Sequence, residues 1–251
     1  MIKFFRKIRQ NLLSEGKTGN YLKYAIGEIV LVVIGILIAL QINNWNQKYR
    51  NDRLANIFLT DFKQDLEKDV ESLKRRIANN NQMSSSIDSI LFTLANKKDL
   101  SKKEYLTFME LNASLVYESY FIPEKITLRQ FEASNNASIL SSKKLKNKLF
   151  EYYSENDRNE MNGEKSTQLY QHLFISKEIS MPLFSGDLLS DISGSNLEKS
   201  NVVLKDLVMN PSYIWALKGK KSITNGQTYQ YEKIMTLAEN LIISIDSELK
   251  K

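Results

Sequence analysis

The stretch YAIGEIVLVVIGILIALQINNW, residues 24–45, decides the fold through its length and its scarcity of polar side chains. Between residues 24 and 42 only Glu28 and Gln41 are strongly polar. A helix over these residues is roughly 28 Å long, close to the about 30 Å of hydrocarbon in a bilayer. The stretch therefore predicts a single transmembrane helix over residues 24–42.

Aromatic residues flank this predicted helix on both sides. Tyr21 and Tyr24 lie at its first end, and Trp45 and Tyr49 follow its last residue. Amphipathic rings favour the boundary between hydrocarbon and water. We therefore expect these four residues to anchor the helix at the two interfaces.

Two other interpretations of the stretch have less support. A helix in a soluble core is seldom apolar on all sides over this length. A cleaved signal peptide also combines a basic start with an apolar run, but ALQINNWNQ, residues 39–47, lacks a convincing cleavage site of small residues. We expect the segment to be retained as a signal anchor.

The flanking charges predict the orientation of the span. The chain has a net charge of +6, and residues 1–23 contain six Lys and Arg against one Glu. Only Lys48, Arg50 and Arg53 follow within twenty residues after the span. The more basic side stays in the cytoplasm, which places residues 43–251 in the periplasm, outside the bacterial inner (cytoplasmic) membrane. Because the basic excess lies beside the apolar run, a lipid bilayer is the expected anionic partner and nucleic acid is not.

Residues 1–23 are expected to form a basic cytoplasmic or interfacial segment. Ile2, Phe5, Ile8 and Leu12 recur at helical spacing among its cations, a pattern typical of a short helix on the inner leaflet. A disordered basic tail is the alternative, because helices this short are marginal without a surface to bind.

Within the predicted span, one charged residue and a pair of small residues suggest interactions. Glu28 lies one turn inside the cytoplasmic end, where a carboxylate reaches headgroups and water; contact with a partner's cation or a proton role is the alternative. Gly35 and Ala39 form a small-xxx-small pair, which permits close approach of a second helix. Glu28, Gly35 and Ala39 are therefore candidate contacts in a homo-oligomer or with another membrane protein.

Residues 43–251 predict an all-α domain. Between Gly35 and Gly163 there is no glycine, and Pro123 is the only proline. This scarcity favours long helices over strands and turns. One apolar stripe follows the span at steps of three or four residues: Leu54, Phe58, Phe62, Leu66, Val70, Leu73 and Ile77. The stripe predicts that the transmembrane helix continues into an extracytoplasmic bundle of antiparallel helices.

Further helices are expected along the rest of the chain. They cover residues 102–118, 127–134, 142–178, 199–209 and 224–250. We expect the third of these to break near Gly163, and loops to lie at Pro123 and over residues 185–196.

The sequence contains no recognisable catalytic pair of carboxylates. Asp61, Asp65 and Asp69 are spaced four residues apart and share one face of a helix. With Lys63 and Lys68 beside them, we expect an exposed, charged face.

Metal, cofactor and nucleophile sites are not expected either. The single histidine, His172, has no second ligand of the usual kind, so a structural role is expected. The absence of cysteine excludes thiolate metal sites. Neither the polar stretch 187–196 nor KGKKSITNG, residues 218–226, has the spacing of a calcium loop or a phosphate-binding loop.

Two stretches resemble a known family. YLKYAIGEIVLVVIGILIALQINNWN, residues 21–46, preceded by the basic MIKFFRKIRQNLL, closely resembles the N-terminal signature of an uncharacterised membrane-protein family of Bacteroidota, classed as a domain of unknown function. TLRQFEASNNASILSSKKLKNKLFEYYS, residues 127–154, resembles a second pattern of that family, with Asn135 or Asn136 where many relatives have glycine. The resemblance implies one N-terminal span and a helical exterior domain, and it implies no activity.

The expected function is that of a non-enzymatic envelope protein. We expect residues 43–251 to act as an interaction or scaffold module, because every catalytic arrangement considered lacks members. An extracytoplasmic ligand-sensing domain is the alternative. Since residues 1–23 are too short to hold an output domain, a sensor would signal through a separate membrane or cytoplasmic partner.

Overall fold

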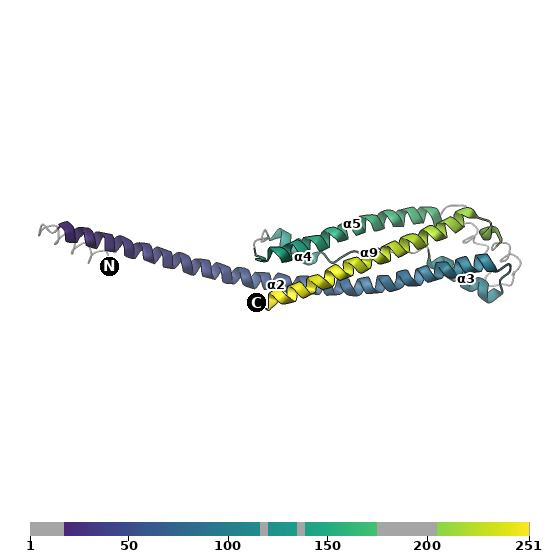
Figure 1. Cartoon of the computed structure of the whole chain (residues 1–251), viewed down its shortest axis with the longest axis horizontal. Coiled ribbons are helices and arrows are strands. Elements are labelled where there is room, and N and C mark those ends of the chain that lie inside the picture. Colours follow the sequence, from purple (N-terminus) through teal and green to yellow (C-terminus); the bar gives the residue numbers. More distant parts are fainter. Residues whose placement is uncertain (1–17, 116–119, 135–138, 175–204, 251) are drawn as a thin grey trace. The chain divides into compact units, whose positions relative to one another are not determined.

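The computed structural model describes residues 18–115, 120–134, 139–174 and 205–250. Regular structure within these ranges is α-helical, which confirms the all-α fold class (Figure 1). The helices are α2 (Thr18–Asn96), α3 (Lys102–Ser114), α4 (Ile126–Ala133), α5 (Lys143–Phe174) and α9 (Pro211–Leu249), and residues 205–208 form a further helical turn. The interfacial helix predicted within residues 1–17 and the loop predicted over 185–196 lie outside the described residues.

The chain divides into two compact units, unit 1 (Met1–Ile57) and unit 2 (Phe58–Lys251). Helix α2 begins in unit 1 and ends in unit 2. Among the described residues, every buried hydrophobic side chain belongs to unit 2. The hydrophobic core of the described chain therefore lies in unit 2.

One part of this core surrounds Phe62 of α2, in the middle of the predicted apolar stripe. The Phe62 ring contacts Phe131 of α4 and Tyr153 of α5, with ring centroids 5.8 Å and 6.3 Å away. Leu66 and Leu73, further along the same stripe, are fully buried. Side chains from elements that follow much later in the sequence thus cover the stripe.

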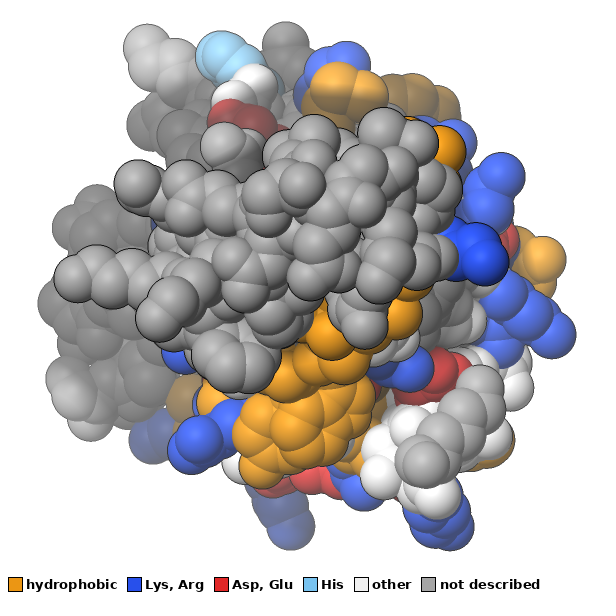
Figure 2. Space-filling view, turned by 90° about the vertical axis from the view of Figure 1, so that its left-hand side faces the viewer, with side chains coloured by type: hydrophobic (Ala, Val, Ile, Leu, Met, Phe, Trp, Pro, Cys, Tyr) orange, Lys and Arg blue, Asp and Glu red, His pale blue; other side chains and the backbone are white. Residues whose placement is uncertain are grey.

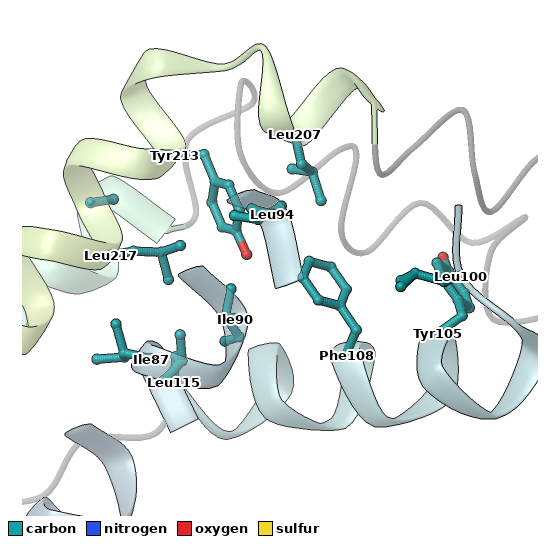
Figure 3. Packing of buried hydrophobic residues seen from close by; sticks show 11 residues of the cluster. Ile87, Ile90, Leu94, Leu100, Tyr105, Phe108, Leu115, Leu207, Tyr213 and Leu217 are labelled. Atoms are coloured by element: carbon teal, nitrogen blue, oxygen red, sulfur yellow. The ribbon is translucent and has the colours of Figure 1, made fainter. Parts of the chain in front are cut away.

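A second buried cluster joins α2, α3 and α9 (Figure 3). Its members are Ile87, Ile90, Leu94, Leu100, Tyr105, Phe108, Leu115, Leu207, Tyr213, Ala216 and Leu217. The Tyr213 hydroxyl donates a hydrogen bond to Oδ1 of the buried Asn112, whose Nδ2 donates to the Phe108 carbonyl at 2.8 Å. A buried amide therefore satisfies its polar atoms inside an otherwise apolar cluster.

Polar contacts connect α9 to both of its long neighbours. Lys63 Nζ of α2 lies 2.6 Å from Asp246 Oδ1 of α9, and Lys221 of α9 pairs with Asp88 of α2. The Lys148 ammonium of α5 donates to the Ser244 hydroxyl of α9 at 2.7 Å. These contacts lie at the edges of the core, where partly exposed ion pairs each add little stability.

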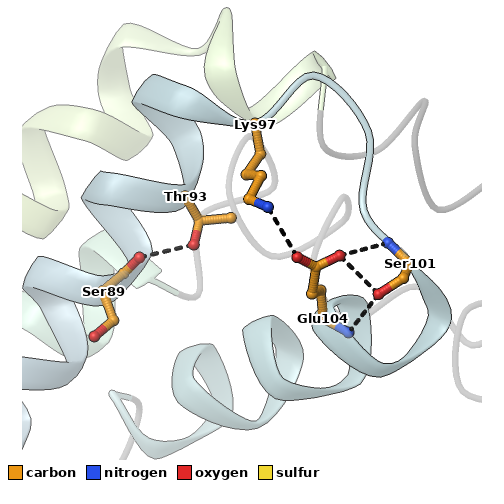
Figure 4. A network of polar contacts seen from close by, with 5 residues as sticks. All are labelled: Ser89, Thr93, Lys97, Ser101 and Glu104. Carbon is orange, nitrogen blue, oxygen red and sulfur yellow. Dashed lines mark hydrogen bonds and ion pairs between the residues drawn. The ribbon is translucent and has the colours of Figure 1, made fainter.

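Helix α3 begins with a capping box (Figure 4). The Ser101 hydroxyl accepts from the Glu104 N–H at 3.3 Å, and the Glu104 carboxylate accepts from the Ser101 N–H at 2.9 Å. Lys97 Nζ lies 3.0 Å from the same carboxylate. Hydrogen bonds from Ser101, with help from Lys97, lower the pKa of Glu104 to about 2. The turn between α2 and α3 is therefore fixed by local sequence.

Helix α9 begins at Pro211, well before the start predicted at residue 224, so that prediction is wrong. The Asn210 side chain accepts from the Tyr213 N–H at 3.2 Å, and Pro211, at the start of the helix, has no N–H of its own that needs a partner. Gly226 costs the helix about 1 kcal/mol relative to alanine. The burial of Tyr213 and Leu217 in the second cluster outweighs that cost.

Helix α5 continues past Gly163, where the sequence predicts a break. A Cβ atom added at Gly163 would lie 2.7 Å from the Cβ of Tyr120. Glycine here permits the close approach of Tyr120 instead of ending the helix. Helices α3, α4 and α5 themselves begin at or next to their predicted first residues.

Candidate functional site

The part of α2 that lies in unit 1 exposes a continuous apolar surface. Every residue from 29 to 50 is exposed, including Leu31 at 67% and Leu37 at 58%. An 18-residue window of this helix has a mean hydropathy of 2.6, and none of the window is buried. Hydrophobic side chains at the surface are also visible on the face drawn in Figure 2. By length and composition, this is a helix that can cross a membrane, although a signal sequence near an N-terminus meets the same criteria.

The predicted interaction residues of the span lie on this helix. Glu28 is half-buried, and Gly35 and Ala39 are exposed. A Cβ atom added at Gly27 or Gly35 would meet no atom within 4 Å, so the small-residue face is open in the described chain. An open face of small residues is compatible with helix association, which stays a prediction.

The predicted interfacial aromatics divide into two groups. Trp45 and Tyr49 are 72% and 64% exposed, as a ring at a lipid–water boundary would be in the isolated chain. Tyr21 and Tyr24 lie in α2, but their side chains are outside the described part of the structure. Their anchoring role stays a prediction.

The aspartates of α2 correct the expectation of an exposed, charged face. Asp65 and Asp69 are only 6% and 2% exposed, and Asp61 is half-buried. Successive helical residues are about 100° apart, so Asp65 and Asp69 adjoin the apolar stripe at its edge. One indication of this burial is present in the sequence, since each aspartate directly precedes a residue of the stripe, Leu66 or Val70. The segments that cover the two aspartates could not be predicted from the sequence.

Backbone N–H groups of a distant segment bind the two carboxylates. Asp69 Oδ1 accepts from the Glu124 N–H at 2.9 Å, and Asp65 Oδ2 accepts from the Thr127 N–H at 3.3 Å. Asp69 Oδ2 also accepts from the Tyr152 hydroxyl of α5 at 2.7 Å. We call Asp65 and Asp69 the carboxylate pair, and residues 120–125, which precede α4, the connector.

The carboxylate pair supplies the cap that α4 lacks locally. Lys125 occupies the N-cap position of α4 and makes no side-chain cap hydrogen bond. Its ammonium instead contacts Asp157 at 2.8 Å and Glu160 at 3.0 Å, both on α5. The Asp65 carboxylate accepts from the first turn of α4, where a negative charge is favourable. The pair thus fastens the connector and α4 to α2.

Burial sets the ionisation of Asp69. It raises the pKa of Asp69 to about 6, against the opposing hydrogen bonds from Glu124 and Tyr152, and the nearby charges of Glu124 and Asp65 add to the rise. Burial and the Asp69 charge together raise the pKa of the Tyr152 hydroxyl. Asp69, which holds the connector, therefore changes its charge near pH 6.

The remaining titratable groups do not extend this pair into a metal centre. Among the residues that the structure describes, no group of three or more His, Cys, Asp or Glu is arranged to hold a metal ion. His172 lies exposed in the last turn of α5.

The described residues define an all-helical protein with one helix long and apolar enough to cross a membrane. Residues 28–180 match the model of the Family of unknown function (DUF6090). Because the match covers more than half of the chain, the chain belongs to this family, as its resemblance to an uncharacterised family implied. The matched range holds the apolar surface, the carboxylate pair and α5, and it ends before α9. No curated protein and no solved structure matches the chain.

Proposed function

We propose that the chain is a single-pass protein of the bacterial inner membrane, with residues 24–42 as its transmembrane helix. The observation that supports this is a helix that is apolar on all sides from residue 29 to residue 40 and exposed from residue 29 to residue 50. An exposed Leu or Ile side chain forgoes about 1.5–3 kcal/mol relative to a buried one, and a bilayer restores that burial. Retention of the segment, not cleavage, follows from the lack of a small-residue cleavage site.

The orientation rests on the flanking cations. Residues 1–23 hold six Lys and Arg, and the twenty residues after the span hold three. The N-terminus is therefore cytoplasmic, and unit 2 is periplasmic.

Unit 2 acts as a non-enzymatic interaction or scaffold module in the envelope. The buried Asp65, Asp69 and Asn112 serve in hydrogen bonds between its own elements, as a rigid module requires. The pairs Lys63–Asp246 and Asp88–Lys221 support the predicted antiparallel arrangement of α2 and α9, because their residue numbers run in opposite directions. A homo-oligomer or a membrane-protein partner contacts the span through the open face at Gly35 and Ala39.

Ligand sensing by unit 2 is the second candidate function. A groove between α5 and α9, lined mainly by amide, hydroxyl and charged residues, is the observation that favours it. A separate membrane or cytoplasmic partner then carries the signal.

Cysteine labelling tests the topology, because the chain contains no cysteine of its own. Glu239 is exposed on α9, and Lys17 lies before the span. A membrane-impermeant maleimide added to spheroplasts is expected to label Glu239→Cys at once and Lys17→Cys only after lysis. The reverse pattern would contradict the orientation.

Site-specific photo-cross-linking tests the scaffold role in native membranes. Photoreactive residues in the full-length chain at Tyr229 and Ile243, both exposed on α9, are expected to give discrete adducts with defined envelope proteins. The same residue at Leu31 is expected to give adducts with lipid or with partner spans only. Absence of protein adducts across α9, together with substrate turnover by the purified full-length chain, would overturn the proposal.

A further inference from the structure

The interface between α5 and α9 changes character halfway along α5. The two helices lie side by side (Figure 1). Leu145, Leu149 and Tyr152 in the first half of α5 are buried, as expected for a helix in a bundle. In the second half, the positions that face α9 are polar or glycine over several turns.

These polar positions form a groove with two walls. On α5 the wall consists of Asn159, Asn162, Gly163 and Ser166, at the spacing of three and four residues that a buried stripe would have. On α9 it consists of Ser222, Ile223, Gly226, Gln227 and Gln230. A stripe at core spacing that is built from amides, hydroxyls and glycines fits a polar ligand better than a packed interface.

A cluster of charges lies at one end of the groove. Lys233 Nζ of α9 contacts Glu155 Oε1 at 2.6 Å, and Arg158 of α5 pairs with the other oxygen of the same carboxylate. Hydrogen bonding and charge from Lys233, followed by those from Arg158, lower the pKa of Glu155. Two cations share one anion, so the cluster carries a net charge of +1 at neutral pH.

On the α9 side of the groove, Gly226 leaves space that a larger side chain would occupy. A Cβ atom added at Gly226 would meet no atom within 4 Å, so a side chain there would enter open space. Gly163 in the opposite wall is backed by Tyr120 instead. Gly226 is therefore the position where a larger residue fills the groove without displacing the core.

We propose that this groove binds a small hydroxylated carboxylate, of which a sugar acid is the simplest example. Side-chain amides offer a donor and an acceptor to neighbouring hydroxyl groups, and the hydroxyl of Ser222 does the same. The Ser166 hydroxyl donates to the Asn162 carbonyl at 2.8 Å and offers the ligand an acceptor. The net positive charge of the cluster attracts the carboxylate, and the guanidinium of Arg158, which lines the groove, binds it through charge-assisted hydrogen bonds. The inference deepens the second candidate function, ligand sensing, and does not depend on the scaffold role.

Calorimetric titration of the full-length chain in a non-ionic detergent tests the proposal, with glucuronate as the probe. Glucose has the hydroxyls without the charge, and hexanoate has the charge without the hydroxyls. We expect glucuronate to bind about tenfold or more tightly than either, the effect of losing a charge-assisted hydrogen bond or several neutral ones. Absence of glucuronate binding, or equal binding of the three solutes, would overturn the proposal.

Variants locate the binding in the groove. Gly226→Leu fills the groove with a stronger helix former and is expected to weaken glucuronate binding about tenfold or more, because the ligand loses its space. Asn225→Leu, on an exposed neighbouring position outside the groove, is the matched control and is expected to leave the affinity within about twofold. Arg158→Gln is expected to weaken glucuronate and leave glucose unchanged.

Helix content and the melting temperature are measured for each variant, so that a loss of binding can be distinguished from a loss of folding. Binding of glucuronate to Gly226→Leu as tightly as to the wild type would place the ligand elsewhere and overturn the proposal. The titration uses neither a bilayer nor a partner, so its failure leaves the membrane anchor and the scaffold role standing, and their failure does not affect it.

Discussion

Two stretches of α2, residues 29–42 and residues 58–94, differ in the exposure of their apolar side chains. In the first stretch apolar residues occupy all sides of the helix, and all of them are exposed. In the second most of them follow one stripe, and Phe62, Leu66, Leu73 and Ile87 are fully buried, whereas Phe92 is exposed. The difference shows that the arrangement of apolar residues around a helix, as much as their number, decides whether the chain's own elements can cover them.

The difference has a simple geometric cause. A stripe about 100° wide can be covered by neighbouring helices, whereas a helix that is apolar all round needs an apolar surrounding. Unit 2 supplies such neighbours for residues 58–94 through α3, α4, α5 and α9. A lipid bilayer is the surrounding that we propose for residues 24–42.

The largest effect is expected from charges placed on the apolar surface. The double substitution Ile34→Asp and Ile38→Asp should disfavour insertion by about 5–7 kcal/mol, at about 2.5–3.5 kcal/mol for each charge at the centre of a span. Cell fractionation should then recover the chain outside the membrane fraction, with unit 2 still helical by circular dichroism. A double variant that remains in the membranes would break the comparison.

The next largest difference between the two stretches is expected when one side chain in each is truncated. Phe62→Ala should lower the free energy of unfolding of unit 2 by about 3–5 kcal/mol, because it removes buried ring contacts and leaves a cavity. Leu31→Ala, its matched control on the exposed stretch, should leave unfolding of unit 2 unchanged. Urea titration of the full-length chain in detergent measures both, and equal losses in the two variants would contradict the account.

The buried Asp69 should make the stability of unit 2 depend on pH. Its pKa is about 6 in the folded chain and 3.8 ordinarily, so the folded state holds the proton more tightly between these values. The contribution of Asp69 to the free energy of unfolding is therefore full below pH 4 and falls by about 3 kcal/mol as the pH rises past 6.

Asp69→Asn isolates this contribution. The amide keeps an acceptor for the Glu124 N–H and carries no charge. The variant should thus become more stable relative to the wild type between pH 4 and pH 7.5, as measured by urea titration at each pH. Parallel pH profiles for the two chains would show that Asp69 is not the group responsible.

Adjacent tyrosines provide a smaller, sharper test of the same region. Tyr152 donates to Asp69 at 2.7 Å, whereas the buried Tyr153 hydroxyl has no hydrogen-bond partner among the described residues. Tyr152→Phe should cost about 1–3 kcal/mol, because the Asp69 carboxylate loses a donor. Tyr153→Phe should stay within about 0.5 kcal/mol of the wild type. Equal effects in thermal unfolding would contradict the hydrogen bond to Asp69.

The smallest effect is expected at the turn between α2 and α3. Ser101→Ala removes the hydroxyl that accepts from the Glu104 N–H and should cost about 1 kcal/mol. Hydrogen exchange of the first amides of α3 should accelerate in this variant and stay unchanged in α9. Unchanged protection in α3 would show that the capping box does not stabilise this helix.

Local patterns in the sequence predicted much of this fold. The stripe through Phe62, Leu66 and Leu73, the apolar stretch over residues 24–42 and the starts of α3, α4 and α5 follow from periodicity and from helix-breaking residues. The start of α9 was also readable, since Asn210 followed by Pro211 is a typical beginning of a helix.

What sequence reasoning missed depends on contacts between distant segments. Asp65 and Asp69 are buried because the connector and α5 cover the edge of the stripe, and Gly163 stays in a helix because Tyr120 approaches it. The polar groove requires α5 and α9 to lie side by side, although neither stretch has a recognisable motif. Such features arise from tertiary packing and leave no periodic signal in one chain.

The most direct test of the central claim is the partition of the unmodified full-length chain in its own cells. After an alkaline carbonate wash and flotation of the membranes, the account predicts that the chain floats with the lipid at its full length. Recovery of the chain in the soluble fraction, or of a shortened chain that has lost residues 1–42, would contradict it.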